Sequence, residues 1–315
     1  SKIQKGWGMR NFKKLFFFGI ASFLVFLAVV RQVDIADITG VLKSLDWRFS
    51  VAAFLLYFAA NILRAFRFDL ILGNRIGFWP FLKIVFFQNF YGAFLPFRLG
   101  ELSYIHMVNK NNINIGHNIA SLIGARVLDL LSIIIIFATA LLFSYQGILG
   151  AGNLFLLAAG LMLAGIILGV IFIFYSRNIV NFLENLLRKT RFYDRGAVQY
   201  FFERLKEIAD GFLNFKKEKS LLKIFTLSLA VWISIYLSGF MLIRGIGIEL
   251  NLWQTFFVYG FPILIGLTPF FIFGGLGAYE GSVIFGLLFF GISRGTAAAV
   301  GLILHAQELL FIVVL

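Results

Sequence analysis

The sequence predicts an all-α, polytopic helical membrane protein with two broken, re-entrant hairpins, and three observations lead to this fold class. The chain of 315 residues is 60% hydrophobic and only 14% charged, with a mean hydropathy of +0.92, which excludes an ordinary soluble domain. Apolar windows of about 17 to 25 residues, long enough to cross a hydrocarbon core of roughly 30 Å, recur along the chain. Two of these windows contain proline and clustered glycine, which interrupt a helix.

The two interruptions share one composition, because each places proline, glycine and a glutamate within an apolar run. The first consists of Pro96, Gly100 and Glu101. The second consists of Pro269, Gly274, Gly275, Gly277 and Glu280. Non-helical backbone at membrane depth is tolerated only inside protein or beside a wet cavity. We therefore expect residues 80–110 and 252–292 to form two re-entrant hairpins whose tips meet near the bilayer midplane.

The order of spans predicts a single integral membrane domain over residues 1–315. Besides the hairpins, we expect spans at about 15–30, 48–63, 119–143, 154–175, 221–243 and 296–315. A first half of about 1–175 and a second half of about 221–315 then flank a basic, amphipathic cytoplasmic segment, 176–220. Each half reads as span, broken hairpin, span, with the hairpins entering from opposite faces. Secondary transporters built as inverted repeats have this arrangement.

Charge along the chain predicts the orientation and the membrane. Lys13 and Lys14 precede the first apolar run and place the N-terminus in the cytoplasm. That run lacks a small-residue cleavage site, so we expect a span rather than a signal peptide, in the cytoplasmic membrane. The second span is expected to end at the cytoplasmic face with Arg64, Arg67 and Arg75.

Composition also indicates which cofactors and partners to expect. The net charge of +13 is explained by basic cytoplasmic loops rather than by nucleic-acid binding. The chain has no cysteine and three histidines far apart in sequence, so we expect no disulfide, metal or other cofactor. The expected partners are membrane lipids with anionic or phosphate-bearing headgroups, and the oligomeric state, a homo-oligomer included, stays open.

Ionisable residues at membrane depth are the candidate site, because a charge at the centre of a span costs about 2.5–3.5 kcal/mol. The candidate substrate-binding residues are Arg98, Glu101, Tyr104, Arg126, Asp129, Gly274, Gly275, Gly277, Tyr279 and Glu280. Arg126 and Asp129 share a helix face at i, i+3 and are as well suited to an internal bridge as to a substrate contact. His305 and Glu308 are interpreted as packing or headgroup residues. Close helix packing is the alternative role of the glycines.

The chemistry expected at the breaks is anion capture. Arg98 offers a planar fork suited to a phosphate. Helices that restart near Leu99 and Ala278 present free N–H groups at a positive dipole end. Glu101 and Glu280 lie in the first turn of these helices, where they stabilise the helix N-terminus, balance an amine or take up a proton.

These motifs resemble those of the lysylphosphatidylglycerol synthase transmembrane-region family, also called flippase-like membrane proteins. The resemblance rests on Pro96 to Glu101, on Arg126 to Asp129, on Pro269 to Glu280 and on the early arginines, Arg64 and Arg67. It covers nearly the whole chain. It implies a role in moving phospholipids or polyprenyl-phosphate lipids, as the flippase portion of multiple-peptide-resistance proteins does for aminoacylated phosphatidylglycerol.

The sequence departs from the family pattern, and other functions stay open. Tyr104 stands where arginine is common and Phe271 where serine is common, which leaves the headgroup open. No soluble acyltransferase-like domain is present, so we expect no synthesis of lysyl-lipid by this chain. No Walker motif occurs, so the favoured function is lipid translocation without ATP hydrolysis. The alternatives are a membrane-embedded transferase acting on a lipid headgroup, with Glu101 or Glu280 as base, and a scaffold subunit for a cell-envelope enzyme.

Overall fold

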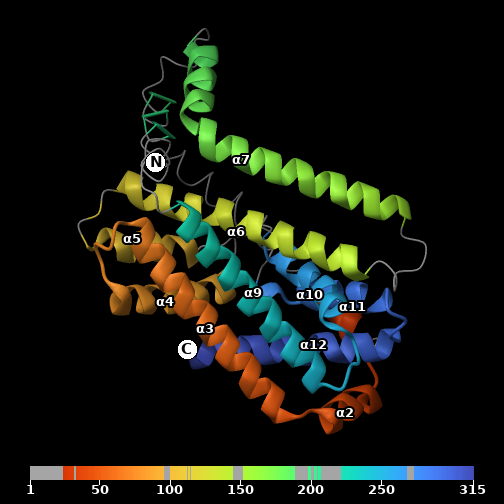
Figure 1. The fold of residues 1–315 in the computed structure, drawn as a ribbon. Coiled ribbons are helices and arrows are strands. Elements are labelled where there is room, and N and C mark those ends of the chain that lie inside the picture. The colour runs from red at the N-terminus through yellow and green to blue at the C-terminus, as the bar shows by residue number, and fades with distance from the viewer. Residues whose placement is uncertain are drawn as a thin grey trace, which may run out of the picture.

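The architecture is helical throughout the part of the chain that the structure, a computed structural model, describes (Figure 1). The described residues are 24–31, 33–95, 100–111, 113, 115–144, 152–188, isolated positions between 198 and 206, 221–267 and 273–315. Among them, four helical segments are long and apolar enough to cross a membrane: Trp47–Ile71, Ser121–Ser144, Leu221–Gly245 and Arg294–Val314. The expected all-α membrane class is confirmed.

The first half is a series of helices whose ends follow from local sequence. They are α2 (Ile35–Ser44), α3 (Trp47–Ile71), α4 (Phe78–Phe94), α5 (Gly100–Asn109), α6 (Ile115–Ser144) and α7 (Gly152–Arg188). The Asp46 side chain caps α3 by accepting from the Arg48 N–H at 2.9 Å. Leu95 ends α4 in an extended conformation, as the residue before a proline favours. Helix α7 continues without interruption across the predicted boundary at residue 175.

The second half consists of α9 (Leu221–Gly245), α10 (Leu252–Gly266), the 3₁₀ turn η3 (Phe273–Gly275), α11 (Ala278–Leu288) and α12 (Arg294–Val314). Its order matches that of α3–α6, because in each half a long helix (α3 or α9) is followed by an interrupted pair (α4 and α5, or α10 and α11) and then by a second long helix (α6 or α12). A capping box between Asn251 and Gln254 starts α10, and the Ser293 hydroxyl caps α12. Helix α11 begins at Ala278, where the sequence predicted that a helix restarts.

The helices pack in pairs that match between the halves. Helices α3 and α9 lie against each other (Figure 1). Helix α4 packs on α3 and α5, as α10 packs on α9 and α11; likewise α12 contacts α4, as α6 contacts α10. Exchanging α3–α6 with α9–α12 therefore preserves these neighbours. An inverted repeat requires that the helices of one half have the same neighbours as their counterparts in the other half. The repeat itself and the re-entrant path of the hairpins stay predictions.

The expected end of the second span is wrong. Helix α3 continues beyond residue 63 to Ile71, so Arg64 and Arg67 lie within the helix rather than at its end. The Arg67 side chain is fully buried. It is accommodated because acidic and hydroxyl groups from other helices surround it, as described next.

Candidate functional site

A polar cavity of about 220 Å³ lies where the two interrupted pairs meet. Its wall includes α4, α5, α10, η3 and α11, with α3, α6 and α12 completing it. The lining residues are Tyr57, Gln88, Asn89, Gly92, Ala93, Glu101, Arg126, Gly266, Gly274, Tyr279, His305, Glu308, Leu309 and Ile312. Both breaks thus contribute to one site.

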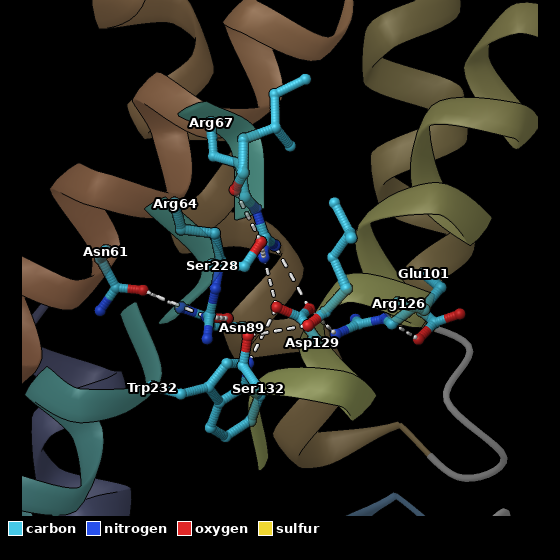
Figure 2. Close-up of polar contacts among 12 residues, drawn as sticks. Asn61, Arg64, Arg67, Asn89, Glu101, Arg126, Asp129, Ser132, Ser228 and Trp232 are labelled. Atoms are coloured by element: carbon cyan, nitrogen blue, oxygen red, sulfur yellow. Dashed lines mark hydrogen bonds and ion pairs between the residues drawn. The ribbon is translucent and has the colours of Figure 1, made fainter. Parts of the chain in front are cut away.

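One side of the cavity carries an accessible ion pair. Arg126 of α6 faces Glu101 of α5, with 2.9 Å between Nε and Oε1 (Figure 2). The two side chains are 33% and 27% exposed, so both reach the cavity while remaining paired. Glu101 lies in the first turn of α5, where a carboxylate is favoured by the helix dipole.

Behind this pair, Asp129 organises a buried polar cluster. Its carboxylate accepts from both terminal nitrogens of Arg67, with Nη2 to Oδ2 at 3.2 Å, and from the Trp232 indole N–H at 2.8 Å. Arg67 also donates to the Ser228 hydroxyl at 2.9 Å. Arg126 approaches the same carboxylate from the cavity at 3.5 Å (Figure 2). Asp129 therefore links the buried Arg67 to the cavity-lining Arg126.

A third arginine, Arg64, joins α3 to α4 through amides. Its Nη1 donates to the Asn89 side-chain oxygen at 3.0 Å, and Asn89 donates in turn to Asn61 at 2.6 Å (Figure 2). Asn89 lines the cavity. The first half of the site is therefore rich in guanidinium and amide donors.

The opposite wall is acidic and phenolic. Glu308 of α12 accepts from the hydroxyls of Tyr259 and Tyr279 through the same oxygen, Oε1. Tyr279 stacks on His305, with 4.4 Å between ring centroids. Both Glu308 and Tyr279 line the cavity, so this wall presents a hydrogen-bond acceptor and a hydroxyl.

A His–Glu pair anchors the second break, with His305 in the cavity wall and Glu280 behind it. His305 Nδ1 lies 2.8 Å from Glu280 Oε1, and its Nε2 lies 2.7 Å from the Gly274 carbonyl oxygen. The other oxygen of Glu280 accepts from the Gly277 N–H at 2.7 Å, which caps α11. Glu280 is only 1% exposed.

The glycines of the second break have conformations that a side chain would disfavour. Gly274, Gly275 and Gly277 have φ values of 71°, 83° and 82°. An L-residue in this left-handed region costs roughly 1–2 kcal/mol. Gly274 also faces the Ala93 carbonyl oxygen of α4, 3.6 Å from an ideal Cβ. The glycines thus serve both the turn and the approach of the two interrupted pairs.

The candidate residues from the sequence fall into five groups. Glu101, Arg126, Gly274 and Tyr279 line the cavity. Asp129 and Glu280 lie behind its wall, and Gly275, Gly277 and Gly100 shape the interruptions. Tyr104 is fully buried among Phe68 and Phe81, and its hydroxyl pairs with Ser121 at 2.8 Å, away from the cavity lining. Pro96, Arg98 and Pro269 lie outside the described residues.

Sequence reasoning missed several residues of the cavity wall. Gln88 and Asn89 interrupt the apolar run of α4, and Tyr57 does the same in α3. Polar side chains in such runs are the signal that points to them. His305 and Glu308 were interpreted as packing residues, yet both line the cavity. Within the described ranges, no group of three or more His, Asp or Glu side chains is placed to hold a metal ion.

Comparison with known proteins identifies the family. No curated protein and no solved structure matches the chain. The family model described as "Lysylphosphatidylglycerol synthase TM region" matches residues 15–315. The four candidate spans among the described residues and this family match show that the chain is an integral membrane protein tied to lipid handling. The chain belongs to the lysylphosphatidylglycerol synthase transmembrane-region family.

Proposed function

We propose that the protein translocates a phospholipid or a polyprenyl-phosphate-linked lipid across the membrane without ATP hydrolysis. The observation that carries this proposal is the polar cavity at the junction of the two interrupted helix pairs. Substrate sites of secondary transporters lie at such junctions of broken helices. We also propose that the two interrupted pairs, α4 with α5 and α10 with α11, are re-entrant and that an inverted repeat relates them.

The distribution of charge in the cavity suits a phosphate-bearing headgroup. Arg126 supplies a guanidinium that is already held by Glu101 and Asp129, so it is oriented before a lipid binds. Arg98, at the first break in sequence, is proposed as a second phosphate ligand. Glu308 with its two tyrosines offers a partner for an amine or a hydroxyl on the same headgroup. A zwitterionic or phosphate headgroup thereby finds complementary groups on opposite walls.

An apolar groove next to the cavity supports lipid as the substrate. It lies between α4 and α12, has a volume of about 430 Å³ and includes Phe86, Phe87, Phe90 and Val313. Ile312 lines both the groove and the polar cavity. A lipid whose headgroup occupies the cavity can therefore keep a hydrocarbon tail in the groove, and Lys83 at the groove adds a cation for an anionic lipid.

The remaining assignments follow the sequence expectations. We place the protein in the cytoplasmic membrane with its N-terminus in the cytoplasm, because Lys13 and Lys14 precede the first span. Membrane lipids are its proposed partners.

Reconstitution in liposomes tests the proposal. Purified protein is inserted into vesicles that contain trace labelled phospholipid or labelled polyprenyl phosphate, and the loss of label from the outer leaflet is followed with a membrane-impermeant quencher. We expect protein-dependent movement of chemically unchanged lipid. A modified lipid product would instead support the transferase alternative, and no movement of either lipid would refute translocation.

Matched variants assign the movement to the cavity. Arg126→Gln and Glu308→Gln each remove one charge from the cavity lining, and Glu308→Gln also retains the side-chain shape. Each is expected to reduce lipid movement at least about tenfold, which corresponds to about 1.4 kcal/mol. Arg98→Ala is expected to do the same. Glu249→Gln, at an exposed position after α9, is the control. Wild-type rates in all three variants, or losses that follow unfolding of the same preparations, would refute the assignment.

A further inference from the structure

The hydrogen bonds of His305 fix the number of protons that it shares with Glu280. The Gly274 carbonyl oxygen can only accept, so His305 Nε2, at 2.7 Å, must carry a hydrogen. Nδ1 lies 2.8 Å from Glu280 Oε1, and this contact also requires a hydrogen between the two atoms. Either the imidazole is doubly protonated beside a carboxylate, or a neutral imidazole accepts from a carboxylic acid. In both cases the pair holds one exchangeable proton and is neutral overall.

Glu308 lacks this requirement although it lies one turn away on the same helix. Its Oε1 accepts from two tyrosine hydroxyls, so a carboxylate is satisfied there without a proton of its own. Glu280 differs because Oε2 already accepts from the Gly277 N–H and Oε1 faces only the imidazole. The exchangeable proton of this wall therefore belongs to the His305–Glu280 pair.

Loss of that proton would break one of the two contacts of His305. A neutral imidazole has a single N–H, which can serve either Gly274 or Glu280 but not both. The other ring nitrogen would then point a lone pair at an oxygen atom. Because His305 and Glu280 are 4% and 1% exposed, water does not replace the lost hydrogen bond without rearrangement, and the unsatisfied buried group is unfavourable.

The contacts of His305 with Gly274 and Glu280 hold the second break in place. Gly274 packs against Leu309 and His305 of α12 and against the Ala93 carbonyl of α4, so it joins the two interrupted pairs. It also lines the cavity, as His305 does. Both contacts of His305 connect α12 to the second break, one through the Gly274 carbonyl and the other through Glu280, whose carboxylate also accepts from the Gly277 N–H. Protonation of the pair keeps both contacts, and loss of the proton between Nδ1 and Oε1 weakens the contact of α12 with residues 274–280.

We propose that the His305–Glu280 pair is the proton-binding site that couples lipid translocation to proton movement. This inference rests on the proposed function. One proton enters from the cavity, resides between Nδ1 and Oε1, and leaves to the other side of the membrane when the contact between α12 and the second break opens. Other ionisable groups at the cavity or next to it will influence the pair: Tyr57 of α3, Glu101 of α5, Arg126 of α6, Tyr259 of α10, Tyr279 of α11 and Glu308 of α12.

Glu280→Gln is the informative variant. A glutamine in the same place can donate its amide N–H to a neutral Nδ1 and accept from the Gly277 N–H with its oxygen. Both contacts of the pair and the bond to Gly274 are then kept without a proton that can leave. The variant is expected to fold and to keep the second break closed at every pH. Glu249→Gln, which changes an exposed carboxylate in the same way, is the control.

The proton site is tested first without lipid movement. The chain has no cysteine, so Leu276→Cys, at a half-buried position of the loop, accepts a single nitroxide label. We expect the electron paramagnetic resonance spectrum to report a more mobile label as pH rises, with a titration of one proton, and no pH response when Glu280→Gln is added. Nitrogen-15 NMR of His305, in a chain with His106 and His117 replaced by glutamine, should titrate in the same range. An equal pH response in the glutamine variant, or no titration of His305, would overturn the inference.

Coupling is then tested in vesicles that carry a pH gradient. The gradient is expected to accelerate lipid movement in one direction at least about tenfold for the wild type and for Glu249→Gln, and to have no effect on Glu280→Gln. Rapid movement that ignores the gradient in all three proteins would overturn the coupling and leave translocation intact. Absence of lipid movement in the wild type, with the titration of His305 present, would instead count against the proposed function and the coupling that rests on it.

Discussion

Removal of the Asp129 carboxylate should be the most destabilising single change in the polar cluster. In Asp129→Ala the fully buried Arg67 guanidinium keeps only the Ser228 hydroxyl among its described side-chain partners. The Trp232 indole N–H loses its acceptor as well. Breaking a buried ion pair from one side typically costs about 3–5 kcal/mol, because the remaining charge stays away from water. We expect a loss of that size.

The comparison variant removes a carboxylate of the same cluster that is accessible. Glu101→Ala breaks the ion pair with Arg126, whose side chain is 33% exposed and keeps Asp129 at 3.5 Å. Exposed pairs are worth about 0–1 kcal/mol. The two variants should therefore differ in the free energy of unfolding by at least about 2 kcal/mol, while Glu101→Ala impairs lipid movement.

The measurement is reversible unfolding in mixed micelles, with sodium dodecyl sulfate as denaturant and helical circular dichroism as the signal. A combined Arg67→Met, Asp129→Leu variant should recover most of the lost stability, because an apolar pair of similar volume replaces a buried ion pair at little cost. Equal stabilities of Asp129→Ala and Glu101→Ala would refute the division into buried and accessible pairs. Failure of the double variant to recover would show that the pair itself, rather than its desolvation, sets the stability.

Three further predictions concern the breaks and the basic segment. Gly100→Ala should destabilise by about 1–3 kcal/mol in the same unfolding assay, because its Cβ would lie 2.2 Å from the Gly92 nitrogen, whereas Gly92→Ala, with open space around its Cβ, should not. Single cysteines at positions 96 and 274 should label from a shared water-filled cavity; labelling from opposite membrane surfaces would contradict the re-entrant hairpins. A peptide of residues 177–219 should bind anionic vesicles, with each Lys or Arg contributing about 1 kcal/mol, and should dissociate as salt rises; equal binding to neutral vesicles would contradict this.

The sequence alone was sufficient for the helical membrane class and for the two interruptions. Apolar length and composition are read directly from the chain, and proline with glycine marks a break wherever it falls. The end of α4 at Phe94 and the start of α11 at Ala278 follow from these local rules. Glu101, Arg126 and Tyr279 were also found from sequence, because polar side chains are rare at membrane depth.

The partners of those residues were decided by the tertiary structure. Arg67 and Asp129 are separated by 62 positions, and Trp232 lies a further 103 from Asp129. Helices that are apolar around their whole circumference carry no stripe to show which face is buried, so the sequence did not indicate that Arg67 faces inward. The end of α3 was mistaken because Arg64 and Arg67 were interpreted as charges at the cytoplasmic face, whereas both lie within the helix.

His305 shows most clearly what the sequence alone could not predict. In sequence it is one histidine in an apolar helix, and a packing role was the plausible interpretation. Its two contacts depend on Gly274, 31 residues away, and Glu280, 25 residues away, meeting its two ring nitrogens. Composition and spacing determine which groups can exchange protons or bind phosphate. The rotation and packing of helices determine which of these groups meet, because hydrogen bonds require contact within about 3 Å between atoms from distant parts of the chain.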